Sequence, residues 1–548
     1  MVLECKRKQM KQKQFLDRTS SLTKLKEVPE WDIIVIGGGA TGLGVALDAS
    51  TRGYKTLLLE RNDFANGTSS RSTKLAHGGV RYLAQGNLSL VKEALKERGL
   101  MLENAPHLVH MLRFIIPSYR WWEKFYYGFG LKIYDWMAKG FRIGKTQLVT
   151  RQKVKRTFRN LRTKNLNGGV VYYDGQFDDA RLALSIAQTA SENGAALLNY
   201  FQVEDLIKKE GKINGVVAHD LEADLSYSLR SKVVVNATGV FADQILKLDH
   251  RKAKPIIKVS QGIHLVLKRA FLQSDNALMI PKTSDGRVLF AVPWKDHLLV
   301  GTTDTPLANP SPQPRPLMEE IQFILNTMER YLVEKPRLDD VLSVFAGLRP
   351  LVQAGDKGKG TKELSRDHKL MTDDSNLITI TGGKWTTYRK MAEDTVDEAI
   401  RVGNLAPAAC VTEHLRLHGY QSEGCAQVDH LCLNYGSDGE KIRKLSLEHP
   451  KFGEKLHRDF PHVVGEVVWF IRYEMARTVE DILARRLRIL FLNARIAIEL
   501  GPKIAEIMAA ELGKDQLWKQ EQIKKFNIIA RSYLPVPAKE QPAQQLEL

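Results

Sequence analysis

The strongest constraint on the fold is a glycine-rich turn between a short apolar strand and a helix near the start of the chain. The segment DIIVI (32–36) is followed directly by Gly37-x-Gly39-x-x-Gly42. In that arrangement Gly37 permits a tight turn, Gly39 lets backbone N–H groups approach a pyrophosphate, and Gly42 allows a helix to pack closely on the strand. Glu60 ends the next predicted strand about twenty residues on, where a carboxylate accepts hydrogen bonds from a ribose. The unit predicts an adenine dinucleotide site, and FAD and NAD share this fingerprint.

Hydrophobic periodicity divides the 548 residues into three folded regions. Strand-like runs alternate with helical stretches around the glycine turn, which predicts a parallel sheet. These further strands are expected at 169–173, 195–200, 232–236 and 377–381. Short strands separated by Pro, Gly and Asp then predict an antiparallel sheet that covers the substrate, and the last region is helical. We expect a basic tail (1–30), a Rossmann-like dinucleotide-binding domain (31–405) with an interleaved cap mainly at 255–351, a C-terminal helical domain (406–530) and a tail (531–548).

The chain is strongly basic, with 81 Lys and Arg against 63 Asp and Glu and a formal net charge of +18. Such a charge attracts anions, and a phosphorylated substrate, acidic lipid headgroups and nucleic acid all qualify. Since no aromatic motif for stacking bases is apparent, we expect no nucleic acid partner. No apolar run approaches the ~18 residues of a membrane-spanning helix, so a single-pass span is not expected.

Cysteine usage bears on the compartment and on metal binding. The four cysteines lack C-x-x-C spacing, and no secretory signal opens the chain, which favours free thiols in a reducing cytosolic compartment. His414, His418 and His430 lie near three of the cysteines, but their intervals match no zinc pattern, so we expect no bound metal. The cysteines are Cys5, Cys410, Cys425 and Cys432.

A series of longer motifs is far more specific than the glycine fingerprint. In chain order they are FANGTSSRSTKLAHGGVRYL, YYDGQFDDARL, VVVNATGVFADQI, VGTTDT, VFAGLRP, SRDH, ITGGKWTTYRKMAED and EMARTVEDILARR. This series resembles the FAD-dependent (aerobic, respiratory) glycerol-3-phosphate dehydrogenases over about 31–500. The resemblance implies FAD as cofactor, an α/β fold with a Rossmann-like FAD-binding domain, and oxidation of sn-glycerol 3-phosphate to dihydroxyacetone phosphate.

The resemblance also implies which residues contact FAD beyond the Gly37–Glu60 unit. Hydroxyls of the Ser/Thr-rich loop would line the pyrophosphate and the flavin edge, and a lysine would add a counter-charge. Two further turns, after VVVN and after LITIT, would approach the cofactor through backbone groups and threonines. These residues are Ser69, Ser70, Thr73, Lys74, Ala237, Thr238, Gly239, Gly383, Lys384, Thr386 and Thr387.

For the substrate, the family pattern implies a cationic set that suits a phosphate: Arg81, His264, Arg349, Arg366 and Lys384. Hydride would leave the carbinol carbon for the flavin while a base accepts the hydroxyl proton. His264 is our preferred base because imidazole titrates near neutral pH, although a local structural role is an equal alternative. Arg81 is the rival group, better suited to stabilising the developing alkoxide. The sequence lacks the calcium loops of some longer relatives near its C-terminus.

An aromatic and basic stretch at 115–145 bears on membrane contact and on the electron acceptor. Its Trp, Tyr and Phe residues are interleaved with Lys and Arg, which suits the headgroup boundary of a bilayer, and a core helix is the alternative. We therefore expect a peripheral protein on the cytoplasmic inner face of the cell membrane that passes electrons to quinone. A related oxidase that reduces oxygen to hydrogen peroxide is the alternative, and a flavoprotein acting on nucleic acid is a remote one. A homodimer is compatible with the sequence.

Overall fold

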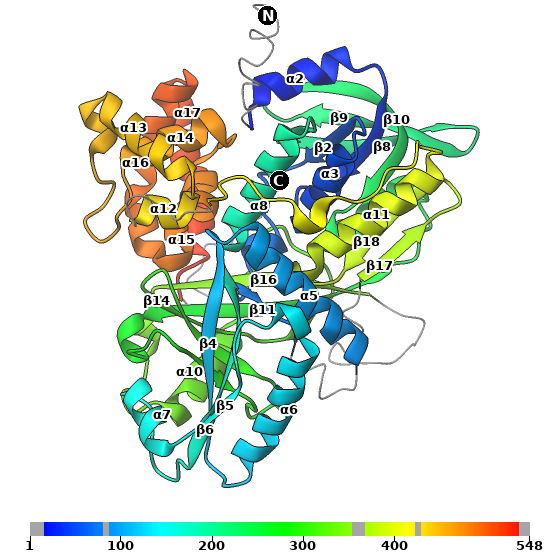
Figure 1. Ribbon diagram of the computed structural model, residues 1–548. Helices are drawn as coiled ribbons and strands as arrows, with labels where there is room; N and C mark the ends of the chain where they lie inside the picture. The colour runs from blue at the N-terminus through cyan, green and yellow to red at the C-terminus, as the bar shows by residue number, and fades with distance from the viewer. Residues whose placement is uncertain (1–15, 80–86, 353–367, 422–428, 536–548) are drawn as a thin grey trace, which may run out of the picture.

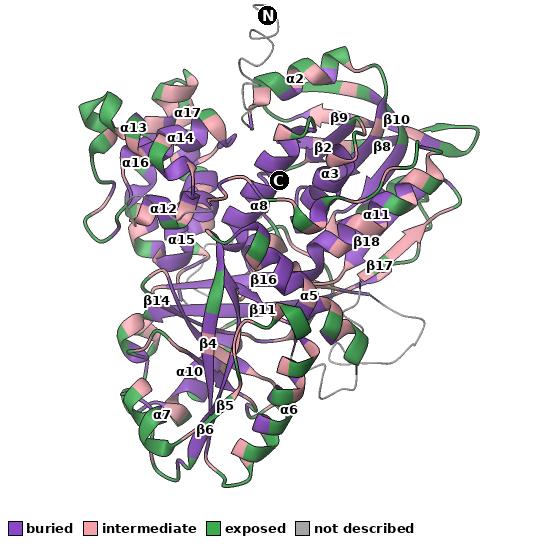
Figure 2. Ribbon diagram, in the orientation of Figure 1, coloured by how far each residue is buried: buried purple, intermediate pink, exposed green. Residues whose placement is uncertain are grey.

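The computed structural model describes residues 16–79, 87–352, 368–421 and 429–535, and they form two sheets and a helical domain (Figure 1). The mixed α/β class, with a dinucleotide-binding domain, a second sheet and C-terminal helices, is confirmed. Both sheets have buried strands, and the exposed side chains lie mainly on the outer helices and loops (Figure 2). Within these described residues, no helix combines the length and apolarity needed to span a membrane.

The glycine-rich turn lies in a mostly parallel sheet of strand order β17-β18-β10-β1-β2-β7. Its central strands read as continuous apolar runs because both faces are covered, and α3, α8 and α11 pack side by side against it. The strands are β1 (Trp31–Ile36), β2 (Thr56–Glu60), β7 (Ala196–Asn199), β8 (Phe201–Lys209), β9 (Lys212–Asp220), β10 (Leu225–Asn236), β17 (His368–Thr372) and β18 (Leu377–Gly382). The helices are α2 (Arg18–Glu27), α3 (Ala40–Thr51), α8 (Asp179–Glu192), α9 (Ala242–Asp249) and α11 (Tyr388–Val402).

The second sheet is mainly antiparallel, with the order β15-β11-β14-β13-β12-β4-β6-β3, and β16 also pairs with β11. Its strands are β3 (Leu75–Ala76), β4 (Val109–Ser118), β5 (Gln147–Val149), β6 (Gly168–Phe177), β11 (Ile257–Lys268), β12 (Ala277–Ile280), β13 (Leu289–Trp294), β14 (His297–Gly301), β15 (Thr305–Leu307) and β16 (Ser343–Val352). Four strands thus come from the segment before 178, so this sheet extends well beyond 255–351. The strand expected at 169–173 in the parallel sheet is instead β6 of the second sheet. The prediction was wrong because an apolar run alone does not reveal which strands it pairs with.

Helix α6 (Glu123–Met137) lies along the outside of the second sheet, near β5 and β6 (Figure 1). Only Gly128, Leu131 and Tyr134 of this helix are buried. Large apolar side chains of the helix and the turn before it face outward: Trp121, Phe129 and Trp136 are 71%, 71% and 75% exposed. The aromatic stretch is therefore not a core helix. The other helices of this part are α5 (Leu88–Asn104), α7 (Arg151–Thr157) and α10 (Met318–Tyr331).

The C-terminal region is a helical domain whose apolar core also includes Val266, Trp294, Leu299 and Phe345 of the second sheet. Its helices are α12 (His430–Tyr435), α13 (Asp438–Glu448), α14 (Val464–Tyr473), α15 (Ile489–Leu492), α16 (Ala494–Leu512) and α17 (Gln516–Arg531). Cys410 is a free thiol, as expected, but Cys432 is disulfide-bonded, so the prediction of free thiols is wrong there. The spacing argument failed because a structural disulfide requires proximity in space and no particular interval in sequence.

Buried ion pairs join this helical domain to the dinucleotide-binding domain. Asp63, in the loop after β2, is bonded by the guanidinium groups of Arg485 and Arg486 at 2.6 and 2.7 Å. Asp179, at the start of α8, accepts from Arg488 at 2.9 Å. None of these five side chains is more than 3% exposed. Because a buried charge is stabilised by its partners, these pairs couple the stability of the two domains.

Candidate active site

A cavity of about 580 Å³ opens where the carboxyl ends of β1, β10 and β18 meet. Ligands bind at this position in sheets of this kind. The lining includes most of the cofactor residues expected from the sequence: Gly37, Gly39, Glu60, Ser69, Ala237, Thr238, Gly239, Gly383 and Lys384. Segments separated by more than 300 residues in sequence, such as those of Gly37 and Gly383, therefore line one cavity.

The glycines of the turn fit an adenine dinucleotide for reasons visible in the backbone. Gly37 has a φ of +109°, and a Cβ atom there would lie 2.7 Å from the carbonyl oxygen of Ala237. A Cβ atom at Gly42 would lie 1.9 Å from the carbonyl oxygen of Gly37. Gly39 is the N-cap of α3 and has no side chain, and the cavity is also lined by Ala40 and Thr41 at the start of that helix. Backbone amides at a helix N-terminus are donors that suit a pyrophosphate.

Glu60 and Ser69 hold the glycine turn in place. One carboxylate oxygen of Glu60 accepts from the Gly38 amide at 2.6 Å, and the other accepts from the Asn62 amide at 2.8 Å. Burial raises the pKa of Glu60, against the lowering effect of these two bonds. The Ser69 hydroxyl accepts from the Ala40 amide at 2.9 Å. Both side chains line the cavity, and their direct contacts with FAD remain predictions.

Lys74 occupies a different place from the one expected. Its side chain is fully buried, and its ammonium donates to the Ser70 carbonyl and to Asp179, both at 2.7 Å. Burial lowers the pKa of Lys74 to about 7, against the raising effect of Asp179. Neither Ser70, Thr73 nor Lys74 is among the residues that line the cavity. The sequence could not indicate this, because the partner of Lys74 lies about a hundred residues away.

The paired strands β11 and β16 have two facing glycines on one face, between Arg349 and His264. Ser260 lies opposite Arg349, Gly262 opposite Gly347, and His264 opposite Phe345. Cross-strand partners share a face, and so do alternate residues of one strand. A Cβ atom at Gly262 would lie 2.3 Å from a guanidinium nitrogen of Arg349, so this guanidinium lies across the glycine.

Arg349 is fixed by groups that the sequence reasoning did not assign. Its guanidinium donates to the Thr302 hydroxyl at 3.0 Å and lies 3.6 Å from the Asp304 carboxylate. Asp304 also accepts from the Ser260 hydroxyl. Thr302 and Asp304 both belong to the VGTTDT motif, to which the sequence analysis assigned no role. Pro350, the next residue after Arg349, lines the cofactor cavity.

His264 is buried at the other end of this face. Its Nε2 lies 2.9 Å from the Thr73 hydroxyl, and its ring stacks on Phe345 with the centroids 5.0 Å apart. Burial lowers the pKa of His264 well below its ordinary value, and the charges of Lys74 and Arg349 act in the same direction. The imidazole is therefore neutral at physiological pH. Thr73, expected at the cofactor, instead orients this histidine.

The turn after β18 contains the last of the expected cofactor residues, Lys384, Thr386 and Thr387. Lys384 lines the cavity, and the indole of Trp385, which was not predicted, donates to the Ser69 carbonyl at 2.9 Å. The Thr386 hydroxyl accepts from the His77 amide, and Thr387 bonds to the backbone of Lys384. Both threonine hydroxyls therefore form hydrogen bonds with backbone atoms of the protein, and their contacts with FAD stay predictions. Arg81 and Arg366 lie outside the described residues, and their roles remain predictions.

Comparison with known proteins identifies the family of this chain. Residues 32–389 match the family of FAD dependent oxidoreductases, and residues 378–522 match the C-terminal domain of alpha-glycerophosphate oxidase. The chain is 42% identical to the mitochondrial glycerol-3-phosphate dehydrogenase of Mus musculus, over 92% of this chain and 74% of that protein. It is also 42% identical to a probable mitochondrial glycerol-3-phosphate dehydrogenase of Caenorhabditis elegans, over 93% of this chain and 74% of that protein.

A solved structure extends the likeness to three dimensions. The glycerol-3-phosphate dehydrogenase of Bacillus halodurans, complexed with FAD, superposes with a TM-score of 0.78 at 30% identity and covers 97% of this chain and 99% of its own. The glycine turn, the helix N-terminus and the cavity are the features that suit FAD in this chain. The chain is an FAD-dependent oxidoreductase and belongs to the FAD-dependent glycerol-3-phosphate dehydrogenase family.

Proposed function

We propose that the protein oxidises sn-glycerol 3-phosphate to dihydroxyacetone phosphate with FAD as the hydride acceptor. The observation that supports the proposal is the guanidinium of Arg349, which lies across Gly262 on the paired strands β11 and β16, one residue before Pro350 of the cavity wall. A planar guanidinium binds a phosphate dianion through two parallel N–H donors. The names of the curated relatives, which are glycerol-3-phosphate dehydrogenases, support the same substrate.

In the proposed reaction the residues bind, orient and accept a proton. Arg349 binds the phosphate, and Thr302 and Asp304 already orient its guanidinium N–H groups. Lys384 adds positive charge from the cavity wall. His264 accepts the carbinol proton, because its buried ring is neutral and has a lone pair to offer. FAD, when bound, supplies the acceptor for the hydride, and loss of proton and hydride leaves the ketone.

Anaerobic reduction of the bound flavin tests the proposed substrate. Glycerol 3-phosphate should bleach the flavin absorbance of the purified protein with one dihydroxyacetone phosphate formed per FAD, and unphosphorylated glycerol should bleach it far more slowly. Equal rates with both alcohols would contradict a phosphate-dependent site. If only another phosphorylated alcohol bleached the flavin, the phosphate-binding site would stand and that alcohol would be the substrate.

We propose a membrane quinone as the electron acceptor, with oxygen as the alternative. The exposed aromatic side chains of α6 and the turn before it support membrane contact, because rings of this kind are favoured at the headgroup boundary. Turnover should be fast with a soluble quinone analogue and slow with oxygen. Stoichiometric hydrogen peroxide at the full rate in air would favour the oxidase instead.

The compartment is a separate proposal. We propose a peripheral location on an energy-conserving membrane. The sequence predicts the cytoplasmic inner face of the cell membrane, whereas the curated relatives described above are named as mitochondrial. Fractionation of cells that express the tagged protein distinguishes the two membranes, and recovery in the soluble fraction at low salt would contradict both.

A further inference from the structure

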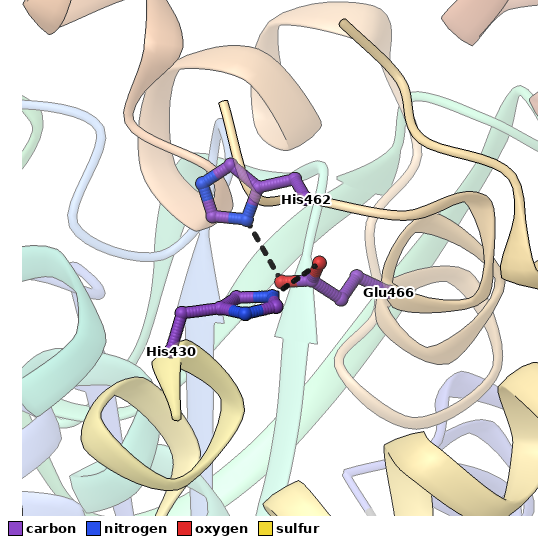
Figure 3. Close-up of side chains that lie close together, drawn as sticks. All are labelled: His430, His462 and Glu466. Atoms are coloured by element: carbon purple, nitrogen blue, oxygen red, sulfur yellow. Dashed lines mark hydrogen bonds and ion pairs between the residues drawn. The ribbon is translucent and has the colours of Figure 1, made fainter. Parts of the chain in front are cut away.

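Three side chains that could bind a metal ion meet in the helical domain, apart from the FAD cavity. His430 opens α12, while His462 precedes α14 and Glu466 lies in its first turn. The donor atoms of the three lie within 4.8 Å of one another. Figure 3 shows the Glu466 carboxylate between the two rings. Its oxygens lie 3.2 Å from Nε2 of His430 and 2.9 Å from Nδ1 of His462. The sequence reasoning paired His430 with nearby cysteines and therefore missed this cluster.

Two further groups fix the carboxylate from its outer side. The Tyr435 hydroxyl donates to Oε1 of Glu466 at 2.6 Å, and the Val463 amide donates to Oε2 at 2.8 Å. Glu466 is fully buried, so its carboxylate is held in one orientation by these two donors and the two rings. Partners of this kind orient and polarise a carboxylate ligand in known metal sites.

We propose that His430, His462 and Glu466 form a Zn²⁺ site that fastens α12 to the start of α14. Two imidazoles and one carboxylate suit Zn²⁺, and a water completes its preferred four ligands. Donors at about 2.0–2.2 Å from a tetrahedral ion lie roughly 3.3 Å apart, close to the two contacts observed here. An ion that needs six ligands is less suited, because the outer side of Glu466 is already occupied.

The ion enters without breaking the fold. It replaces only the two contacts between the imidazoles and Glu466, because each ring binds the ion through the nitrogen that faces the carboxylate. The bonds from Tyr435 and Val463 stay in place. The side chain of His430 is 25% exposed, which gives the ion and its water a path from solvent.

Metal titration of the full-length, FAD-loaded protein tests the site. After treatment with a chelator and desalting, the protein should bind one equivalent of Zn²⁺ with a Kd below about 1 µM. Binding should raise the thermal midpoint of the helical domain, measured by circular dichroism, by a few degrees. Tyr435→Phe should weaken binding roughly tenfold to a hundredfold, since it removes a supporting bond.

The decisive variant is His430→Gln, whose amide can still donate to Glu466 and keep the metal-free fold. It should weaken Zn²⁺ binding at least about a hundredfold while leaving the metal-free midpoint and the FAD content unchanged. His449→Gln, an exposed histidine of the same domain, is the matched control and should bind like the parent. A parent Kd above about 10 µM, or equal affinity in both variants, would show that the cluster only caps α14. Neither readout depends on the proposed substrate.

Discussion

At the scale of single residues, Arg349 tests the substrate assignment most directly. Arg349→Ala removes a charged donor pair from the phosphate, and a hydrogen bond to a charged group is worth about 1.5–3 kcal/mol. We expect kcat/KM for glycerol 3-phosphate to fall roughly tenfold to a hundredfold or more. Steady-state kinetics with a quinone analogue measure the loss.

Two controls separate phosphate binding from a structural role of Arg349. The slow turnover of unphosphorylated glycerol should hardly change in the variant, and FAD content should stay normal. Arg330→Ala, an exposed arginine of α10, should leave both substrates unaffected. Equal proportional losses of activity with both alcohols would show that Arg349 supports the structure of the strand and does not bind the phosphate.

Gly39 tests the cofactor site at the same scale. A Cβ atom there would lie 3.2 Å from the Ser69 hydroxyl, and the methyl groups of valine would cover the amides at the start of α3. Gly39→Val should therefore give folded protein with little or no FAD, measured as the ratio of flavin to protein absorbance. Gly130→Ala, where a Cβ atom meets nothing within 4 Å, should keep full occupancy. Full occupancy in Gly39→Val would place the pyrophosphate elsewhere.

At the scale of elements, α6 and the turn before it carry the proposed membrane contact. Changing Trp121, Trp122 and Phe125 to Ser removes exposed rings without touching the buried side of the helix. We expect sedimentation with anionic liposomes to fall severalfold and activity with soluble acceptors to persist. Leu447 and Leu517 are also exposed, at 81% and 72%, but lie in the helical domain. Their double change to Ser should leave liposome binding intact, and equal binding by both variants would mean that the membrane contact lies elsewhere.

Elements with local signals were predictable from the sequence, and elements with distant partners were not. The strand, glycines and helix of 31–51 carry their geometry in a few adjacent residues, so the dinucleotide unit was correct in type and place. Strand β6 carries no local mark of its partner and was assigned to the wrong sheet. The same limit applies to Lys74, whose burial beside Asp179 depends on a helix far along the chain. Thr302 and Asp304 lay in a quoted motif, but only the fold shows that they hold Arg349.

At the scale of the whole molecule, His418 links the helical domain to the rest in a pH-dependent way. Its ring lies 2.8 Å from Glu192 of α8 and 2.5 Å from Asp438 of α13. Burial lowers the pKa of His418, but the two carboxylates outweigh burial and raise it to about 9. Because the folded pKa exceeds the unfolded one, this stabilisation is complete below about pH 6.5 and disappears as pH rises through about 9.

His418→Gln should therefore lower the free energy of unfolding by roughly 2–3 kcal/mol at neutral pH and have little effect near pH 10. Denaturant unfolding at both pH values measures the difference. His414→Gln, an exposed histidine of the same segment, should change stability at neither pH. A loss for His418→Gln that is the same at both pH values would indicate lost packing and not a lost charge.

The ion pairs between domains also constrain how the protein is made. Asp63 and Asp179 are synthesised in the first third of the chain, whereas Arg485, Arg486 and Arg488 follow more than 300 residues later. Asp179 already has Lys74 as a partner during translation, but Asp63 lacks both of its arginines, and burying its carboxylate without a charged partner is costly. The nascent dinucleotide-binding domain is therefore expected to close stably around Asp63 only after Arg485 and Arg486 have left the ribosome. Ribosome-bound chains that stop before 480 should be digested by protease, while chains that extend past 535 should resist it.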